Sequence, residues 1–228
     1  MPQPLSTFRR VKTWHMTPGS VWRRPQLAWH VMHVIEQWSE IEAFTLQLGA
    51  KLMQGDMVTS MSVLQALESH NAQRAATIAA ARASLNPEHF RIFDAALNST
   101  SASRNTRHKF AHHLWGVSDE LLSELLLQNP RHANLEHARI AKIGKAKAAG
   151  AKTNEPIEVD RSTIFVWTKD DFDLASKAAL KARNIVVTLY SVVSALESGR
   201  PVDSTLNSLA NDPLIRQRLH KENTQRSP

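Results

Sequence analysis

Apolar residues recur at three- and four-residue intervals along most of this chain, which is the spacing of helices that bury one face. Five segments carry this pattern and predict main helices: about 27–53, 58–85, 86–97, 104–116 and 168–196. The scarcity of glycine and the many alanines and leucines also favour helix over sheet. We therefore predict an all-α fold, a bundle of four to five main helices.

Local signals mark the ends of several of these helices. Asn86-Pro87 is a start signal, because Asn caps a helix and Pro suits its first turn. The run Thr168-Lys169-Asp170-Asp171 resembles a capping box with Asp in place of Glu. Gly199 and Pro201 stop the helix that follows it.

Two segments have the composition of strands. Residues 162–167 are rich in β-branched and aromatic side chains and form the best strand pattern in the chain. The leucine-rich run 121–127 continues as helix or forms a short strand after the turn at 118–120. The two segments can pair as a small two-stranded β insertion beside the bundle.

The chain divides into an arm, a helical domain and a tail. Prolines break regular structure in the arm, residues 1–26, where tryptophans stand among arginines. Such rings either stack on unpaired bases or pin the arm onto the helical body, and we favour pinning. The helical domain covers 27–200 and contains a basic excursion at about 129–161. Residues 201–228 form a tail with short helices.

Composition narrows the classes of protein. With 228 residues, 42% of them hydrophobic, the chain can bury one sizeable core. The absence of cysteine excludes disulfides, thiolate zinc sites and a cysteine nucleophile, and it suits a reducing cytosol. We find no apolar run near 18 residues and no apolar leader segment, so we expect a cytoplasmic protein without a transmembrane helix or a membrane partner.

The net charge of +7 is unevenly distributed. Residues 1–26 contain five basic side chains and no acidic one, and residues 131–152 contain six basic side chains against Glu136. Basic extensions on a less basic body indicate either a polyanionic partner or a solvated surface. Charge alone does not separate the two.

The most informative segment is Arg107-His108-Lys109-Phe110-Ala111-His112, an arginine followed by four residues and a histidine. These two residue types can cut RNA without a metal ion. RNA carries its nucleophile in the 2′-OH, histidine transfers protons near neutral pH, and an arginine fork holds phosphate oxygens. The segment resembles the catalytic motif of the HEPN superfamily, with His108 after the arginine and Ala111 before the final histidine. Helix count and motif placement extend this resemblance over roughly 27–197.

The resemblance implies a metal-independent endoribonuclease, or a toxin-like effector directed at RNA, that acts as a homodimer without a cofactor. The resemblance implies that His112 is the general acid or base and that Arg107 clamps the phosphate. It also implies that His108 orients either His112 or Arg107. The residues expected to bind nucleic acid are Arg104, Lys109, His113, Lys142, Lys145 and Lys147. The residue after the arginine departs from the family, which more commonly has Asn or Asp there.

The spacing of the motif restricts how its residues can meet. Arg107 and His112 are five residues apart, about 140° around an ideal helix. They converge if Arg107 lies in an irregular first turn, if its long side chain wraps around the helix, or if a second copy supplies one of the pair. His113 offers an equally acceptable spacing from Arg107, so the functional histidine is either His112 or His113.

Other classes of function stay open on these residues. One is a non-catalytic helical module that binds nucleic acid, a nucleotide or a protein partner such as an antitoxin. Another is a structural protein in which the motif is a relic or a coincidence. A zinc pair at His108 and His112 is disfavoured, because Lys109 stands where a zincin helix has Glu and no third ligand is evident. We expect no metal.

Overall fold

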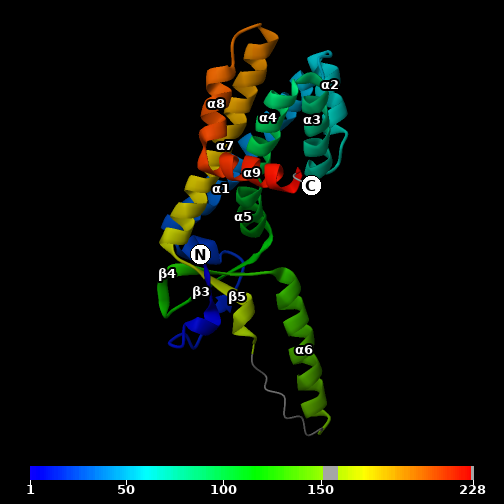
Figure 1. Cartoon of the computed structure of the whole chain (residues 1–228). Coiled ribbons are helices and arrows are strands. Elements are labelled where there is room, and N and C mark those ends of the chain that lie inside the picture. The colour runs from blue at the N-terminus through cyan, green and yellow to red at the C-terminus, as the bar shows by residue number, and fades with distance from the viewer. Residues whose placement is uncertain (151–158, 227–228) are drawn as a thin grey trace. The chain divides into compact units, whose positions relative to one another are not determined.

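The computed structural model describes residues 1–150 and 159–226, the side chains of 221–226 excepted (Figure 1). Over these residues it is 72% helical and contains a five-stranded antiparallel sheet. The predicted predominance of helix is confirmed. The sheet is larger than the two-stranded insertion that the sequence indicated.

The chain forms two compact units, each assembled from two stretches of sequence. The sheet unit comprises Met1–Ile35 and Thr106–Ser176, and the helical unit comprises Glu36–Asn105 and Lys177–Pro228. Three helices contain a boundary between the units: α1 (Pro25–Leu52), α5 (Ser101–His112) and α7 (Lys169–Glu197). The arm at residues 1–26 therefore belongs to the same unit as the Arg-His motif.

The sheet has the strand order β1-β5-β4-β3-β2, and every neighbouring pair is antiparallel. The strands are β1 (Gln3–Pro4), β2 (His15–Met16), β3 (Leu114–Ser118), β4 (Leu121–Gln128) and β5 (Ile164–Trp167). The predicted pairing of the two strand-like segments is confirmed, because β4 lies beside β5 with Leu126 opposite Val166. The additional strands extend this ribbon on both sides.

Both edge strands come from the arm, which the sequence did not indicate. Between and around them the arm contains the 3-10 turns η1 (Leu5–Thr7) and η2 (Ser20–Arg23), and a third, η3 (Arg161–Thr163), precedes β5. Leu5 and Val11 are fully buried in a cluster with side chains of β4 and β5. Trp14 packs against this cluster, as the pinning interpretation expects, whereas Trp22 is 71% exposed.

The helix that carries the motif differs from the predicted one at both ends. It was expected over 104–116, but α5 starts at Ser101, with only Thr100 between it and the end of α4 (Pro87–Ser99). It stops at His112, and Leu114–Ser118 continues as β3. The helix ends early because residues 114–118 form a hairpin with β4 instead, and β3 makes its backbone hydrogen bonds to that strand.

The basic excursion contains the helix α6 (Pro130–Ala148), which begins directly after β4 and extends beyond the sheet (Figure 1). Asn129 caps it, since the Asn129 side-chain oxygen accepts from the N–H of Arg131 at 2.9 Å. Ile143 is its buried side chain, and the rest of the helix is mostly solvated. The helix ends at Ala148, with Ala149 as its C-cap, and residues 151–158 of the excursion lie outside the described residues.

The helical unit contains α4, parts of the three shared helices and four further helices. These are α2 (Met57–Gln65), α3 (His70–Ser84), α8 (Asp203–Asn211) and α9 (Pro213–Arg226). The predicted single helix over 58–85 is wrong, because Ser69 caps a new helix by accepting from the N–H of Ala72. The short helices expected in the tail are confirmed as α8 and α9.

The core of the helical unit is formed mainly by α1, α4 and α7. Trp38, Phe93 and Leu189 are among its most buried side chains. Among the described residues, α7 is the one helix that is long and apolar enough to cross a membrane by length and composition alone. A core helix passes the same test, and Val186 and Leu189 of α7 are fully buried in this core.

Candidate functional site

A cluster of aromatic rings holds the end of α5 against the sheet. Phe110, only 2% exposed, lies with its ring centroid 4.9 Å from Trp167, 5.5 Å from Trp115 and 5.5 Å from Phe172. The indole N–H of Trp115 also donates to the carbonyl oxygen of Phe110 at 3.2 Å. Rings at these separations attract one another in tilted and edge-to-face arrangements. The cluster therefore determines where the residues on either side of Phe110 project.

Beside this cluster lies a hollow of about 490 Å³ whose largely apolar lining includes Lys109, His113 and His132, and we call it the basic hollow. Its side chains come from the arm, the end of α5 and the residue after it, the start of α6, the turn η3 and the strands β4 and β5. They are Met1, Pro2, Lys109, His113, Leu127, Asn129, His132, Ser162, Thr163, Phe165 and Trp167. Its volume falls within the range of small-ligand sites, and it combines an apolar floor with cationic and hydroxyl groups.

His113 is the best candidate for proton transfer in the basic hollow. Partial burial lowers the pKa of its imidazole below 6.5, and the charges of Lys109, His108, His112 and His132 lower it further. His113 is therefore held neutral at pH 7, with a free ring nitrogen that can accept a proton. Lys109, one turn earlier on α5, supplies a positive charge in the same hollow.

Hydrogen bonds fix the wall of the basic hollow opposite α5. Thr163 Oγ1 donates to the carbonyl of Asp160 at 2.9 Å and accepts from Gln128 Nε2 at 3.1 Å. Asn129, the cap of α6, holds the first turn of that helix, which contains His132. The hollow is thus lined both by hydrogen-bonded side chains such as Thr163 and by exposed ones such as Lys109.

The predicted catalytic residues occupy different surroundings. Arg107 is half-buried, whereas His108 and His112 are exposed with ring centroids 4.7 Å apart, and none of the three lines the basic hollow. Because α5 begins at Ser101, Arg107 lies beyond its first turn, and an irregular first turn is no longer a way to bring Arg107 to His112. The wrapped side chain and the second copy remain as routes.

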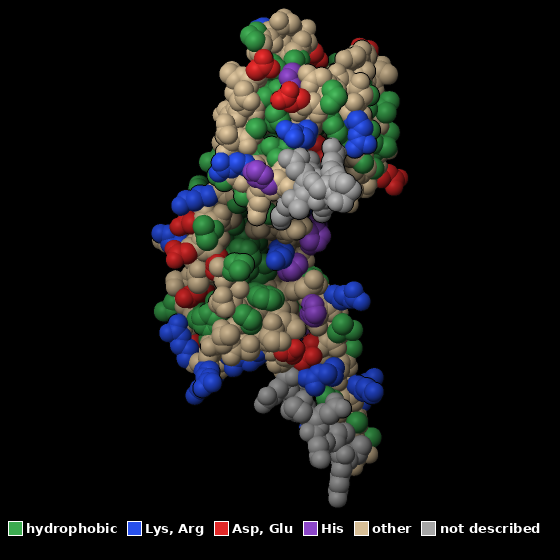
Figure 2. All heavy atoms as spheres, in the orientation of Figure 1, with side chains coloured by type: hydrophobic (Ala, Val, Ile, Leu, Met, Phe, Trp, Pro, Cys, Tyr) green, Lys and Arg blue, Asp and Glu red, His purple; other side chains and the backbone are tan. Residues whose placement is uncertain are grey.

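The residues predicted to bind nucleic acid fall into three groups. Lys109 and His113 line the basic hollow. The three lysines of α6, Lys142, Lys145 and Lys147, are exposed, and Figure 2 shows basic side chains continuing along that helix. Arg104 belongs to the helical unit, where its guanidinium donates to the side-chain oxygen of Asn71 at 2.6 Å. That bond gives Arg104 a structural partner.

His132 was not among the residues predicted from the sequence. The turn at 118–120 could have indicated its place. A hairpin that closes at this turn has the register that sets Leu114 opposite Gln128. His113 and Asn129 are then the next residues at the open end of the hairpin, and His132 follows in the first turn of α6. A strand at 114–118, once recognised, would have brought His113 and His132 together.

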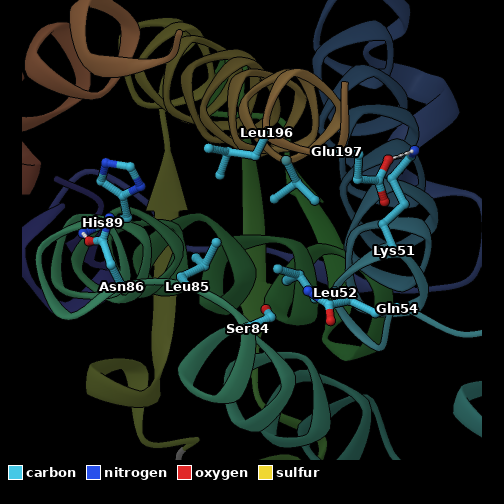
Figure 3. A pocket seen from close by; sticks show the side chains of 10 residues that line it. Lys51, Leu52, Gln54, Ser84, Leu85, Asn86, His89, Leu196 and Glu197 are labelled. Carbon is cyan, nitrogen blue, oxygen red and sulfur yellow. Dashed lines mark hydrogen bonds and ion pairs between the residues drawn. The ribbon is translucent and has the colours of Figure 1, made fainter. Parts of the chain in front are cut away.

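The helical unit has a hollow of its own, of about 310 Å³ (Figure 3). At its edge, Lys51 Nζ lies 2.6 Å from Glu197 Oε2, and this hydrogen bond raises the pKa of Lys51. His89, also in its wall, approaches Asp203 at 3.5 Å. Both side chains already have carboxylate partners, so this hollow is a weaker candidate than the basic hollow.

Among the side chains that the structure describes, in residues 1–150 and 159–220, no three of His, Cys, Asp or Glu lie together in a way that could hold a metal ion. Comparisons of the chain with protein-family models, with curated proteins and with solved structures found no match. A function for this protein therefore rests on the chemistry of its own residues.

Proposed function

We propose that this protein is a metal-independent, HEPN-like endoribonuclease that cuts single-stranded RNA in the basic hollow. The observation that carries the proposal is His113, a neutral imidazole of lowered pKa that shares one hollow with Lys109 and His132. Two imidazoles and a cation are the groups that transfer of a phosphodiester to its own 2′-OH requires.

The reaction assigns one role to each residue. The neutral imidazole of His113 takes the proton of the 2′-OH, whose oxygen attacks phosphorus. The bond from phosphorus to the 5′-oxygen breaks, and His132, when protonated, gives that oxygen its proton. Lys109 offsets the charge that develops on the phosphoryl oxygens. The products are a 2′,3′-cyclic phosphate and a free 5′-hydroxyl, and no water or metal ion takes part in this step.

The HEPN resemblance supports the same reaction with a different assignment. In that version, His112 transfers the proton and Arg107 clamps the phosphate, with one of them supplied by the second chain of a homodimer. An isologous pairing of two α5 helices would place both motifs at one two-fold axis. The two assignments share substrate and products, and they differ in the histidine on which activity depends.

A second candidate function is non-catalytic binding of RNA. The exposed lysines in the second half of α6 favour it, because they do not line the hollow and can contact phosphates without taking part in chemistry. The same hollow would then hold a phosphate that is never cut.

RNA cleavage in the presence of EDTA tests the proposal. Wild-type protein should release 2′,3′-cyclic ends from single-stranded RNA and leave DNA intact, because DNA lacks the 2′-OH. His113→Gln should lower the rate by about 10²- to 10⁴-fold, the usual effect of losing a general acid or base. His112→Gln is the matched control, since it removes a neighbouring imidazole that does not line the hollow.

The outcomes separate the three possibilities. Cleavage by His113→Gln at the wild-type rate contradicts His113 as the base. Loss of activity in His112→Gln alone favours the site assembled between two chains. RNA that is bound but never cut by wild-type protein contradicts the nuclease and favours the binding module. Circular dichroism and thermal unfolding should show that both variants keep the wild-type fold.

A further inference from the structure

A second hollow lies on the other side of His113. Its volume is about 530 Å³, and it is lined mainly by apolar and aromatic side chains, so we call it the apolar hollow. Trp22, Met32, Leu114 and Trp115 are among its lining residues, and His113 lines both this hollow and the basic hollow. The two hollows therefore share this imidazole, and Lys109 and His132 line only the basic hollow.

The walls of the apolar hollow come from three segments of the sheet unit. They are the turn of the arm around η2, the first turns of α1, and the junction of α5 with β3. Gly19, with φ of 82°, shapes the turn that presents Trp22. Arg24, just after it, donates to the carbonyl oxygen of Leu121 at 3.2 Å and ties the turn to the β4 strand. The hollow is thus built on an anchored turn.

Its rim exposes apolar side chains to solvent. Trp22 is 71% exposed, Met32 55% and Leu114 40%. Exposed apolar groups of this size gathered around a concave space are typical of binding sites. These surroundings suit a ligand that places a flat or apolar group against Trp22 and an adjacent anionic group near Lys109.

A single strand of RNA has this alternation of an aromatic base and an anionic phosphate. We propose that the apolar hollow holds one unpaired base of the RNA substrate next to the phosphate in the basic hollow. This inference rests on the proposed function and names the form of its substrate. A base in a duplex is stacked and paired, so the hollow would select unpaired strands. Charge complementarity at the adjoining basic hollow favours a nucleic acid over an apolar peptide or a second copy of this chain.

Binding of RNA that cannot be cut tests the inference without requiring chemistry. The probe is a fluorescent 2′-O-methyl oligonucleotide, compared with versions that lack one base at each position in turn. Trp22→Ala should weaken binding of the intact strand by about 5- to 150-fold, the effect of losing one base-aromatic stack. Removal of the base that occupies the hollow should cause a similar loss with wild-type protein and no further loss with Trp22→Ala.

Trp29→Ala is the matched control. Trp29 is 60% exposed on α1, stacks on His33 with centroids 5.0 Å apart, and does not line the apolar hollow. Its substitution should leave binding unchanged. Equal binding of the intact strand by wild type and Trp22→Ala overturns the inference, and so does a change of oligomeric state in Trp22→Ala, measured by light scattering, with RNA binding unaltered.

The inference and the proposed function can fail separately. If wild-type protein cuts ordinary RNA but Trp22→Ala binds as well as wild type, the site is a nuclease whose apolar hollow holds no base. If Trp22→Ala loses base-dependent binding while wild-type protein never cuts, the hollow binds RNA and the catalytic proposal is wrong.

Discussion

Substitution of Phe110 by Ala should detach the motif helix from the sheet and expose the candidate site. The Phe110 ring is 2% exposed and lies within 5.5 Å of three other rings, measured between centroids. Deletion of a buried Phe side chain costs about 3–5 kcal/mol of stability, from lost burial and from the cavity left behind. Phe110→Leu keeps much of the apolar volume but loses the ring pairs, so it should cost less, about 1–2 kcal/mol.

Thermal and urea unfolding measure the loss. In a chain of this size each kcal/mol lowers the Tm by about 2–4 °C, so Phe110→Ala should lower it by about 6–20 °C. Hydrogen exchange at β4 amides reports on the sheet unit separately. Leu122→Ala, at a β4 side chain that is 74% exposed, is the control and should change stability by about 0.5 kcal/mol or less.

A second measurement ties the packing to the site. In Phe110→Ala, loosening of the end of α5 should hydrate His113, and the lowered pKa of its imidazole should then rise towards its ordinary value. An NMR titration of the His113 ring measures this change. A loss of stability below 1 kcal/mol in Phe110→Ala, with unchanged exchange at β4, would refute the role assigned to the ring cluster.

Two further substitutions test how the arm is attached. In Gly116→Ala the new methyl group would clash with Met16 Sδ and lie 2.8 Å from the carbonyl oxygen of His15, so β2 should separate at a cost of about 1–3 kcal/mol. Proteolysis of the arm should then accelerate, whereas Gly144→Ala in α6, where the methyl group meets open space, should not affect it. Ser118 Oγ–H and the N–H groups of Lys12 and Thr13 donate to Glu120 and lower its pKa to about 2, so Glu120 stabilises the fold above pH 4.5 and loses this effect as the pH falls towards 2. Glu120→Gln should be less stable than wild type at pH 7 and equal to it near pH 2. If the free energies of unfolding of the two proteins differ by the same amount at every pH in this range, the stabilising role of the Glu120 carboxylate is contradicted.

Helices and their starts were largely determined by local sequence. The helical periodicity predicted α1, α4 and α7, because residues three or four apart share a face whatever the rest of the chain does. The capping pattern at Thr168 formed as expected, since the Thr168 N–H donates to Asp171 Oδ2 at 3.1 Å and the Asp171 N–H donates to Thr168 Oγ1 at 3.3 Å. Such bonds join residues within one turn, which sequence patterns describe well.

The edges of the sheet were decided by tertiary structure. β1 and β2 are two residues long, and β1 begins at a position where the sequence shows only a proline-rich arm. Their extended backbone is held by partners far along the chain: Gln3 pairs with Val166, and Met16 with Gly116. A strand of two residues has no periodicity of its own, so only its partner reveals it.

The candidate site was also determined partly by the sequence and partly by the tertiary structure. The sequence singled out the segment around Arg107, because a run of arginine, lysine and histidine has recognisable chemistry wherever it folds. The structure distinguished its histidines: His108 and His112 are exposed, while His113 is half-buried between two hollows and within reach of the charge of His132. Burial and the positive charge of neighbouring side chains lower the pKa of a histidine, and at His113 both depend on how the hairpin returns the chain to the end of α5.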